Sequence, residues 1–262
     1  MNSDKARNVR QKGHDDAKEF AHLLGLDDDY QNNPQAKKDV IDPCGDAHSV
    51  KSGQKKWQIF LYSASRFQQD TIFKRLNGLG QLLLDALDVF PDTFEEYKAN
   101  KEKYKYQLAP RMEALKNRLQ NPETLKAFFD KSFFNAAEVE FLTIKHGGKF
   151  HVFHRDDVLR ILTNNITVVN SKRRRRGEFD NQKVVFKIPH PDKKNKLVTI
   201  GEIEIRKDSK IHYKEMKFWM EKEKTFDLLF SSIDEKKQLS ENIPIYIYGK
   251  AIKKFLKCKK KK

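Results

Sequence analysis

The chain has 262 residues, of which 38% are hydrophobic and 34% are charged, and its formal net charge at pH 7 is +16. This length and apolar content are enough for a buried core, in one large domain or two small ones. No run of about 18 apolar residues occurs, which predicts no membrane span. The polar N-terminus lacks the apolar core of a signal peptide, so we expect a cytoplasmic protein.

The positive charge is concentrated in two segments. Residues 145–200 carry 14 Lys or Arg against 5 Asp or Glu, and residues 249–262 carry 8 Lys and no acidic residue. Charge concentrated in this way is typical of a surface that binds a polyanion, whereas scattered Lys indicates only a solvated surface. We therefore expect nucleic acid as the partner.

The first expected element is a helix that begins at residues 13–16, after a frayed polar segment over residues 1–13. Acidic residues at 15 and 16 favour a helix N-terminus there. Apolar side chains recur at helical spacing from Ala17 to Leu24, and Gly25 ends the pattern. Glu19 lies on the more polar side of this helix, where it is either an exposed surface carboxylate or a functional one.

A β-hairpin is expected next. Residues 39–42 and 48–51 are short alternating runs, and a turn rich in Pro, Gly and Asp separates them. On the second strand, Ser49 and Lys51 share one face and Val50 points to the core. Residues 57–62 follow as a buried strand rich in aromatic and β-branched side chains.

The hairpin can bring an Asp of its first strand beside Lys51. Asp39 is the first choice, and Asp42, just before the turn, is its rival; the register of the strands decides between them. A carboxylate beside an ammonium group suits metal-dependent phosphodiester hydrolysis, because the carboxylate holds Mg²⁺ and the Lys orients or helps to ionise water. The alternative is a surface hairpin with two solvated charges.

These residues also resemble a known family. Asp39, Ser49-Val50-Lys51, a Gly and the aromatic strand resemble the core of the PD-(D/E)xK nuclease superfamily. The segment SVKSG…KKWQIFLYS is similar to type II restriction endonucleases in particular. The resemblance implies that Asp39 and the Val50 carbonyl bind Mg²⁺ and that Lys51 is catalytic.

Ser49 departs from that pattern, which usually has Glu or Asp in its place. Because a hydroxyl is a poor Mg²⁺ ligand beside a carboxylate, a second carboxylate has to come from elsewhere. Residues 13–25 resemble the first helix of the same nucleases, which often carries a Glu that reaches the metal. Glu19 is therefore the first candidate for the missing ligand, and Asp42 is a further one.

The middle of the chain is predicted to be helical and to end in a second hairpin. A core helix is expected through Leu82–Leu87. The remaining elements are expected as helices over 93–118, 124–134 and 156–162, and as strands over 139–144, 150–154 and 166–169.

A basic loop and a charged strand follow. Lys172 and the four arginines Arg173, Arg174, Arg175 and Arg176 lie in a loop between two expected strands. Arg binds guanine or phosphate with two hydrogen bonds, and we expect these side chains to bind phosphate. Strands are expected over 184–188, 197–205 and 243–248.

The second of these strands and the residues after it supply further candidates for DNA contacts. The candidates are Glu202, Glu204, Arg206, Ser209 and His212. Glu can accept a hydrogen bond from cytosine, whereas ion pairing with neighbouring Lys is the structural alternative. The region from Gly201 through Phe230 also resembles the C-terminal part of restriction endonucleases.

Together these features predict a mixed α/β (α+β) protein. We expect a PD-(D/E)xK nuclease core, a mixed central β-sheet flanked by helices, with a helical insertion over residues 1–135. A β-rich basic recognition region over residues 136–262 is expected to pack with it as one continuous unit. The expected activity is that of a type II restriction endonuclease, which hydrolyses double-stranded DNA with Mg²⁺ and leaves 5′-phosphate and 3′-hydroxyl ends.

The expected partners follow from that activity. They are double-stranded DNA, a second copy of the chain in a homodimer, and functionally a cognate DNA methyltransferase of a restriction-modification system. Two alternatives stay open: a DNA repair or junction-resolving nuclease with the same site, and a non-catalytic protein that binds nucleic acid through its basic surfaces.

Overall fold

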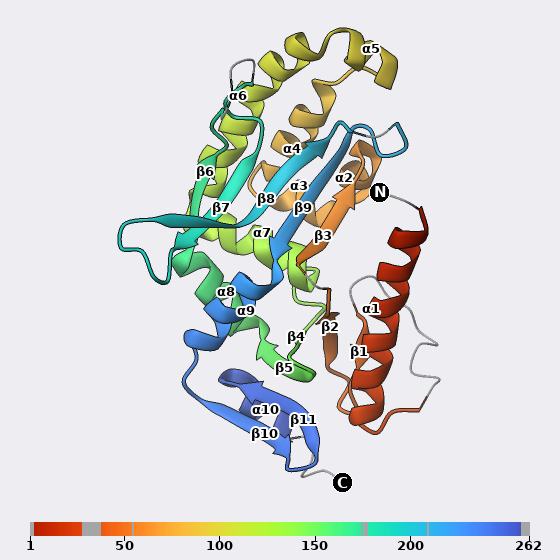
Figure 1. Cartoon of the computed structure of the whole chain (residues 1–262), viewed down its shortest axis with the longest axis vertical. Helices are drawn as coiled ribbons and strands as arrows, with labels where there is room; N and C mark the ends of the chain where they lie inside the picture. Colours follow the sequence, from red (N-terminus) through yellow and green to blue (C-terminus); the bar gives the residue numbers. More distant parts are fainter. Residues whose placement is uncertain are drawn as a thin grey trace. The chain divides into compact units, whose positions relative to one another are not determined.

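The computed structural model describes residues 3–27, 38–53, 55–173, 175, 178–208 and 210–257 (Figure 1). Over these residues the chain is a mixed α/β protein with ten helices and eleven strands. It forms two compact units. Unit 1 comprises Met1–Trp57, Phe129–Ile161 and Lys222–Lys262, and unit 2 comprises Gln58–Phe128 and Leu162–Glu221.

Unit 1 contains a six-stranded mixed sheet in the order β1-β2-β4-β5-β11-β10. The strands are β1 (Val40–Ile41), β2 (Ala47–Lys51), β4 (Phe141–His146), β5 (Lys149–His154), β10 (Lys236–Ser240) and β11 (Ile243–Tyr248). Strand β2 pairs with β4 in parallel, and β5 pairs with β11 in parallel, while the other pairs are antiparallel. The helices of this unit are α1 (Ser3–Leu23), α9 (Lys222–Ser231) and α10 (Lys250–Lys257).

The core of unit 1 lies between one face of this sheet and helices α1 and α10. Phe20 of α1 and Phe255 of α10 pack against strand residues such as Phe141 and Ile247. These side chains alternate with outward-facing ones, because successive residues of a strand point to opposite faces. Val50 packs against the same cluster, as the alternation predicts.

Unit 2 contains a five-stranded antiparallel sheet in the order β3-β9-β8-β7-β6. The strands are β3 (Lys56–Tyr62), β6 (Thr167–Asn170), β7 (Val184–Pro189), β8 (Leu197–Arg206) and β9 (Glu215–Glu221), and the helices are α2 (Ala64–Gln69), α3 (Thr71–Arg75), α4 (Leu79–Asp88), α5 (Phe94–Ala99) and α6 (Lys101–Leu119). Helices α7 (Pro122–Phe134) and α8 (Arg155–Asn165) have residues in both units.

Aromatic rings fill the core of unit 2. Phe60 of β3, Phe128 of α7 and Phe218 of β9 lie within ring-centroid distances of 5.1 to 6.2 Å of one another. The opposite face of the sheet is polar, since Ile203 and Ile205 of β8 are buried whereas Glu202 and Glu204 are half-buried. An antiparallel sheet commonly has one packed and one solvated face.

Several expectations are met and others are corrected. The strand expected over 243–248 is β11, and the hairpin around Gly147-Gly148 is β4–β5. The frayed segment expected over residues 1–13 is wrong for residues 3–13, because α1 begins at Ser3. Its Lys, Arg, Gln and Ala are good helix formers, and a single Gly inside a helix costs only about 1 kcal/mol.

The compact units do not divide the chain at residues 135 and 136. Each unit gathers segments that are distant in sequence, because the parallel pairing of β2 with β4 joins residues that are about ninety positions apart. The strand that follows the hairpin, β3, belongs to the sheet of unit 2. No helix in the described ranges is both long and apolar enough to cross a membrane.

Candidate active site on the β1–β2 hairpin

The register of the hairpin places Asp39 opposite Ser49. Val40 pairs with His48 and Ile41 pairs with Ala47, and the Asp39 amide donates to the His48 carbonyl at 2.9 Å. Asp39 thus directly precedes β1 and points to the same face of the sheet as Ser49. Lys51 shares that face, because it lies two residues further along β2.

Asp39, Ser49 and Lys51 form one polar cluster. One carboxylate oxygen of Asp39, Oδ2, accepts from the Val50 amide at 2.7 Å and from Ser49 Oγ at 3.4 Å. Lys51 Nζ lies 3.7 Å from the same oxygen and donates to Ser49 Oγ at 2.5 Å and to the Val50 carbonyl at 3.4 Å. The carboxylate and the ammonium expected from the sequence are therefore neighbours.

The cluster combines a buried hydroxyl group with two charged groups that are partly exposed. Ser49 is fully buried, whereas 37% of the Asp39 side chain and 21% of the Lys51 side chain are exposed. Among the described residues no donor contacts the second Asp39 oxygen, Oδ1. The Val50 carbonyl points to the same side of β2 as the Val50 amide that Asp39 binds, as expected for one residue of an extended strand. A carboxylate oxygen and a carbonyl oxygen are thus available on one side.

Asp42 is not part of this cluster. It is 5% exposed, and its Oδ1 accepts from the Cys44 amide at 2.8 Å and the Asp46 amide at 3.0 Å. Its Oδ2 lies 3.4 Å from Nε2 of the fully buried His48. Burial alone would raise the pKa of Asp42, but the His48 hydrogen bond and the two amides outweigh it and lower the pKa. Asp42 thus stabilises the hairpin turn.

Glu19 is also engaged elsewhere. Lys145 Nζ donates to Glu19 Oε2 and to Asp16 Oδ1, both at 2.6 Å. Burial alone would lower the pKa of Lys145, but these two hydrogen bonds raise it above the ordinary value. The register partner of Lys51 is Ile144, so the next residue, Lys145, points to the opposite face of the sheet. The structure therefore does not bring Glu19 to Asp39.

The donor set fits a hydrated Mg²⁺ ion better than a fully protein-bound metal. Within the described part of the chain, no group of three or more His, Cys, Asp and Glu side chains is arranged to hold a metal. Mg²⁺ usually keeps several waters and takes only one or two carboxylates in addition to substrate phosphates. Asp39 and the Val50 carbonyl match this requirement, and no second carboxylate from the described residues joins them.

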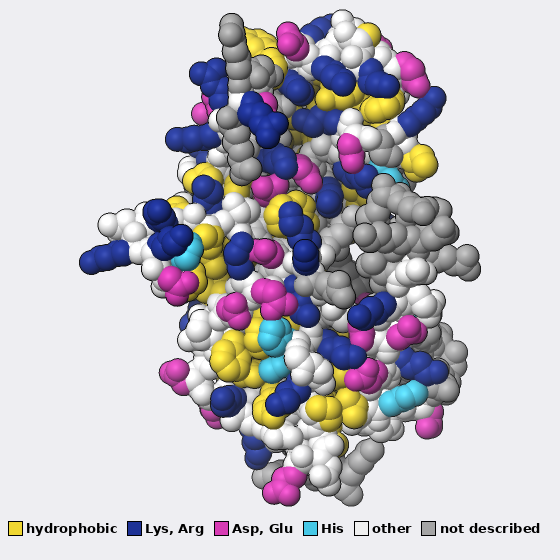
Figure 2. Space-filling view, in the orientation of Figure 1, with side chains coloured by type: hydrophobic (Ala, Val, Ile, Leu, Met, Phe, Trp, Pro, Cys, Tyr) yellow, Lys and Arg dark blue, Asp and Glu magenta, His cyan; other side chains and the backbone are white. Residues whose placement is uncertain are grey.

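The basic loop lies between β6 and β7 in unit 2. Lys172, Arg173 and Arg175 are exposed, while Arg174, Arg176 and Ser209 lie outside the described residues. The Arg173 amide donates to Asp180 at 2.7 Å, which ties the two arms of the loop together. Figure 2 shows further Lys side chains on the β7–β8 turn, at the opposite end of β7, whose cations are Lys193, Lys194 and Lys196.

The other expected DNA contacts are engaged in ion pairs. Lys183 Nζ lies 2.9 Å from Glu202 and 2.7 Å from Glu204. Burial alone would lower the pKa of Lys183, but the two glutamates raise it. Arg206 pairs with Asp208 at 3.3 Å, and His212 pairs with Glu215 at 2.9 Å. The pairing of Glu202 and Glu204 with Lys183 is the alternative that the sequence left open, ion pairing with neighbouring Lys.

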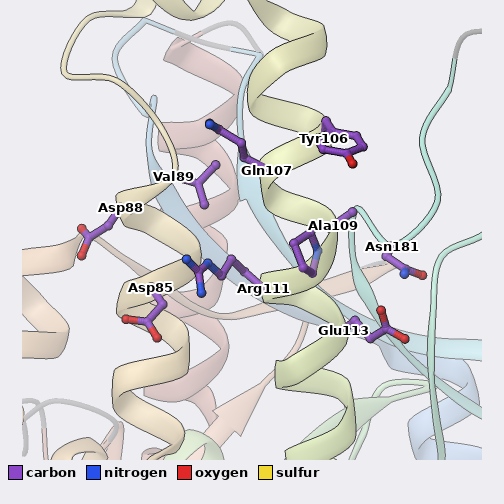
Figure 3. A pocket seen from close by; sticks show the side chains of 10 residues that line it. Asp85, Asp88, Val89, Tyr106, Gln107, Ala109, Arg111, Glu113 and Asn181 are labelled. Carbon is purple, nitrogen blue, oxygen red and sulfur yellow. The ribbon is translucent and has the colours of Figure 1, made fainter.

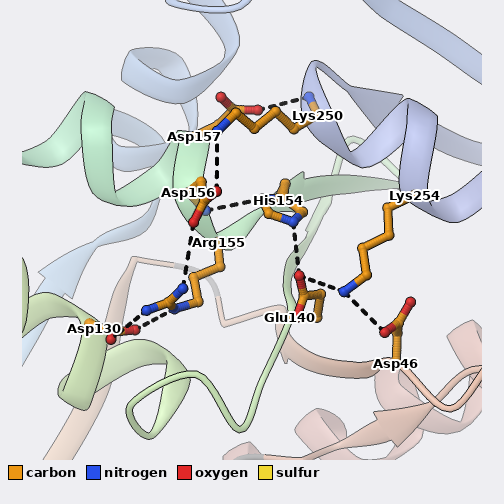
Figure 4. Close-up of polar contacts among 9 residues, drawn as sticks. All are labelled: Asp46, Asp130, Glu140, His154, Arg155, Asp156, Asp157, Lys250 and Lys254. Atoms are coloured by element: carbon orange, nitrogen blue, oxygen red, sulfur yellow. Dashed lines mark hydrogen bonds and ion pairs between the residues drawn. The ribbon is translucent and has the colours of Figure 1, made fainter.

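Part of the Lys-rich C-terminal segment is neutralised within unit 1 (Figure 4). Lys254 lies 2.6 Å from Glu140 and 3.2 Å from Asp46, and Lys250 lies 3.1 Å from Asp156. The same network includes the pair of Arg155 with Asp130, with two contacts of 2.6 Å. Counting charges along the sequence missed this network, because its partners are distant in the chain.

A cavity of about 820 Å³ lies elsewhere, between α4 and α6 of unit 2 (Figure 3). Its lining includes the acidic residues Asp85, Asp88 and Glu113 and one cation, Arg111. This acidic lining does not suit a polyanion, and no residue of the β1–β2 hairpin contributes to it. The hairpin therefore remains the candidate active site.

Comparison of the chain with models of protein families, with curated proteins and with solved structures finds no match.

Proposed function

We propose that this protein is a Mg²⁺-dependent nuclease that hydrolyses phosphodiester bonds of double-stranded DNA in the manner of a type II restriction endonuclease. The observation that carries the proposal is the convergence of Asp39, Ser49 and Lys51 on one face of the hairpin, with Lys51 Nζ 3.7 Å from the Asp39 carboxylate. The exposed arginine loop of unit 2 supports DNA as the substrate.

Each residue of the site would have a different role. Asp39 and the Val50 carbonyl would hold Mg²⁺, which supplies charge stabilisation at the scissile phosphate. Lys51 directs two of its three N–H bonds to Ser49 and Val50, so the third is available to orient water or a phosphate oxygen. Ser49 holds both charged groups in place and does not itself react.

Cleavage of both strands at a symmetric sequence favours a homodimer, because each copy then supplies one active site. A cognate DNA methyltransferase would protect the host's own copies of that sequence. The products would be ends with a 5′-phosphate and a 3′-hydroxyl.

The proposal is tested by incubating the purified protein with long duplex DNA of known sequence, in Mg²⁺ and in EDTA. We expect discrete fragments in Mg²⁺ only, and sequencing of their ends then gives the recognition site. Lys51→Ala and Asp39→Asn should each abolish cleavage. Lys237→Ala is the matched control, because Lys237 is an exposed Lys on the edge strand β10 of the same sheet.

Other outcomes separate the alternatives. A smear of fragments would favour a repair or junction-resolving nuclease, which branched substrates would then identify. DNA that is bound but never cut, with or without Lys51, would contradict catalysis and leave a nucleic-acid-binding protein.

A further inference from the structure

Two lysines of unit 2, Lys105 and Lys207, lie near enough to interact electrostatically. Lys207 follows β8 and donates from Nζ to Gln182 Oε1 at 3.3 Å. Gln182 in turn donates from Nε2 to the carbonyl of Lys105 on α6 at 2.8 Å. Among the described residues, neither Lys105 nor Lys207 forms an ion pair, whereas the neighbouring Lys183 has two. Gln182 thus connects the Lys207 ammonium group to the backbone of Lys105.

The ammonium group of each of these two lysines lies over an aromatic ring. Lys207 Nζ lies 5.7 Å from the ring centroid of Phe90, and Lys105 Nζ lies 5.9 Å from that of Phe179. Both lysines are half-buried, so their ammonium groups are partly desolvated yet still accessible. An ammonium group over an aromatic face in such surroundings keeps only part of the hydration that it has in water.

The electrostatics show that this arrangement disfavours the positive charge on Lys207. Burial, together with smaller contributions from Lys105 and Lys183 that Glu204 opposes, lowers the pKa of Lys207 to about 8. An anion placed between the two lysines would reverse this effect, because an opposite charge favours the protonated form.

The pair adjoins the arginine loop. The Ser171 amide donates to the Lys183 carbonyl, and the Asn181 amide donates to the Ser171 carbonyl, so the loop closes directly beside Gln182. The exposed cations Lys172, Arg173 and Arg175 extend from this base. The two lysines therefore continue a cationic surface that suits a polyanion better than a small isolated anion.

We propose that Lys105 and Lys207 form a phosphate-binding site that holds a phosphodiester group of the DNA backbone beside the arginine loop. The site rests on the proposed function, since it assigns a contact to the same DNA substrate. It adds a feature that ordinary surface lysines lack: proton uptake by Lys207 accompanies DNA binding near neutral pH.

The test is the affinity for a fluorescent DNA duplex, measured by anisotropy in EDTA between pH 7 and pH 9. The protonated fraction of a group with a pKa of about 8 falls about tenfold over this range, so we expect the affinity to fall by up to about tenfold. Lys207→Arg keeps the charge at every pH and should remove this fall. Lys126→Ala, which changes an exposed Lys of unit 2, should show the same fall as the unchanged protein.

Each outcome decides the proposal. Equal pH dependence in the unchanged protein and in Lys207→Arg would overturn it, even if both proteins cut DNA. Proton uptake with inorganic phosphate but not with the duplex would overturn the assignment to DNA. If the protein bound no duplex, both the proposed function and this inference would be overturned. Circular dichroism of Lys207→Arg checks that the fold is intact.

Discussion

At the scale of single residues, Ser49 shows how the site departs from the usual nuclease pattern. It is fully buried and lies between the two charged groups, with Oγ 2.5 Å from Lys51 Nζ and 3.4 Å from Asp39 Oδ2. A hydroxyl can donate to the carboxylate while it accepts from the ammonium. Ser49 is thus a positioning residue that keeps Lys51 near Asp39 without adding a negative charge.

Ser49→Ala should therefore slow cleavage without abolishing it. Loss of the hydroxyl frees the Lys51 ammonium to leave its place, and misplacement of a catalytic group costs on the order of tenfold or more in rate. The measurement is the single-turnover rate at saturating DNA, with the Kd for DNA as a second readout. An unchanged rate would contradict this role, and a weakened Kd with an unchanged rate would assign Ser49 to binding instead.

His151 gives a prediction on stability. It is 7% exposed, its Nδ1 lies 2.7 Å from the Tyr248 hydroxyl, and burial, with smaller contributions from His146 and Lys149, lowers its pKa to about 4. Because the folded pKa lies below that of the unfolded chain, the unfolded state binds more protons as the pH falls below about 6.5. The free energy of unfolding should then fall by roughly 1 kcal/mol per pH unit between pH 6 and 4.5 from this residue alone.

Urea unfolding at several pH values checks this. In His151→Asn the free energy of unfolding should decline less steeply with falling pH than in the unchanged protein. Part of the decline should remain, because burial also lowers the pKa of His48. Parallel declines for the two proteins would show that His151 does not titrate in this way.

At the scale of elements, the sequence predicts the strands and turns that depend on local patterns of residues. The hairpin of β1 and β2 and the strands β4, β5 and β11 follow from alternation and turn residues. The parallel pairing of β2 with β4 is not local, so no periodicity indicates it. The position of Glu19 is not local either: α1 covers the side of the sheet opposite Lys51, and only the tertiary arrangement reveals this.

Two glycines in helices give a matched pair of predictions. A Cβ added to Gly80 in α4 would lie 2.5 Å from the Phe73 carbonyl oxygen, whereas one added to Gly13 in α1 would meet nothing within 4 Å. Gly80→Ala should destabilise the fold by about 1–3 kcal/mol, because the backbone has to shift. Gly13→Ala should stabilise it by about 0.5–1 kcal/mol, because Ala loses less conformational entropy in a helix. Thermal unfolding measures both, and equal shifts would contradict the close packing at Gly80.

At the scale of the whole molecule, net charge alone is a poor guide to where a polyanion would bind. Of the two basic segments, the C-terminal one uses Lys250 and Lys254 for internal ion pairs. The loop before β7 instead exposes its described cations. The candidate active site belongs to unit 1, whereas the arginine loop and the pair of Lys105 and Lys207 belong to unit 2. Chemistry and affinity are thus expected to be separable by mutation.

The double variant Arg173→Gln/Arg175→Gln tests this separation. Each lost phosphate contact should lower the slope of log K against log salt by about 0.9, so the slope should fall by up to about 2 while affinity weakens. The cleavage rate at saturating DNA should stay unchanged, because neither arginine belongs to the site of Asp39 and Lys51. Asp39→Asn should do the reverse, with cleavage lost and the salt dependence kept. Anisotropy between 50 and 200 mM salt and single-turnover cleavage provide the two readouts. If the double arginine variant kept the salt slope of the unchanged protein, the DNA contacts would lie on another surface of the protein.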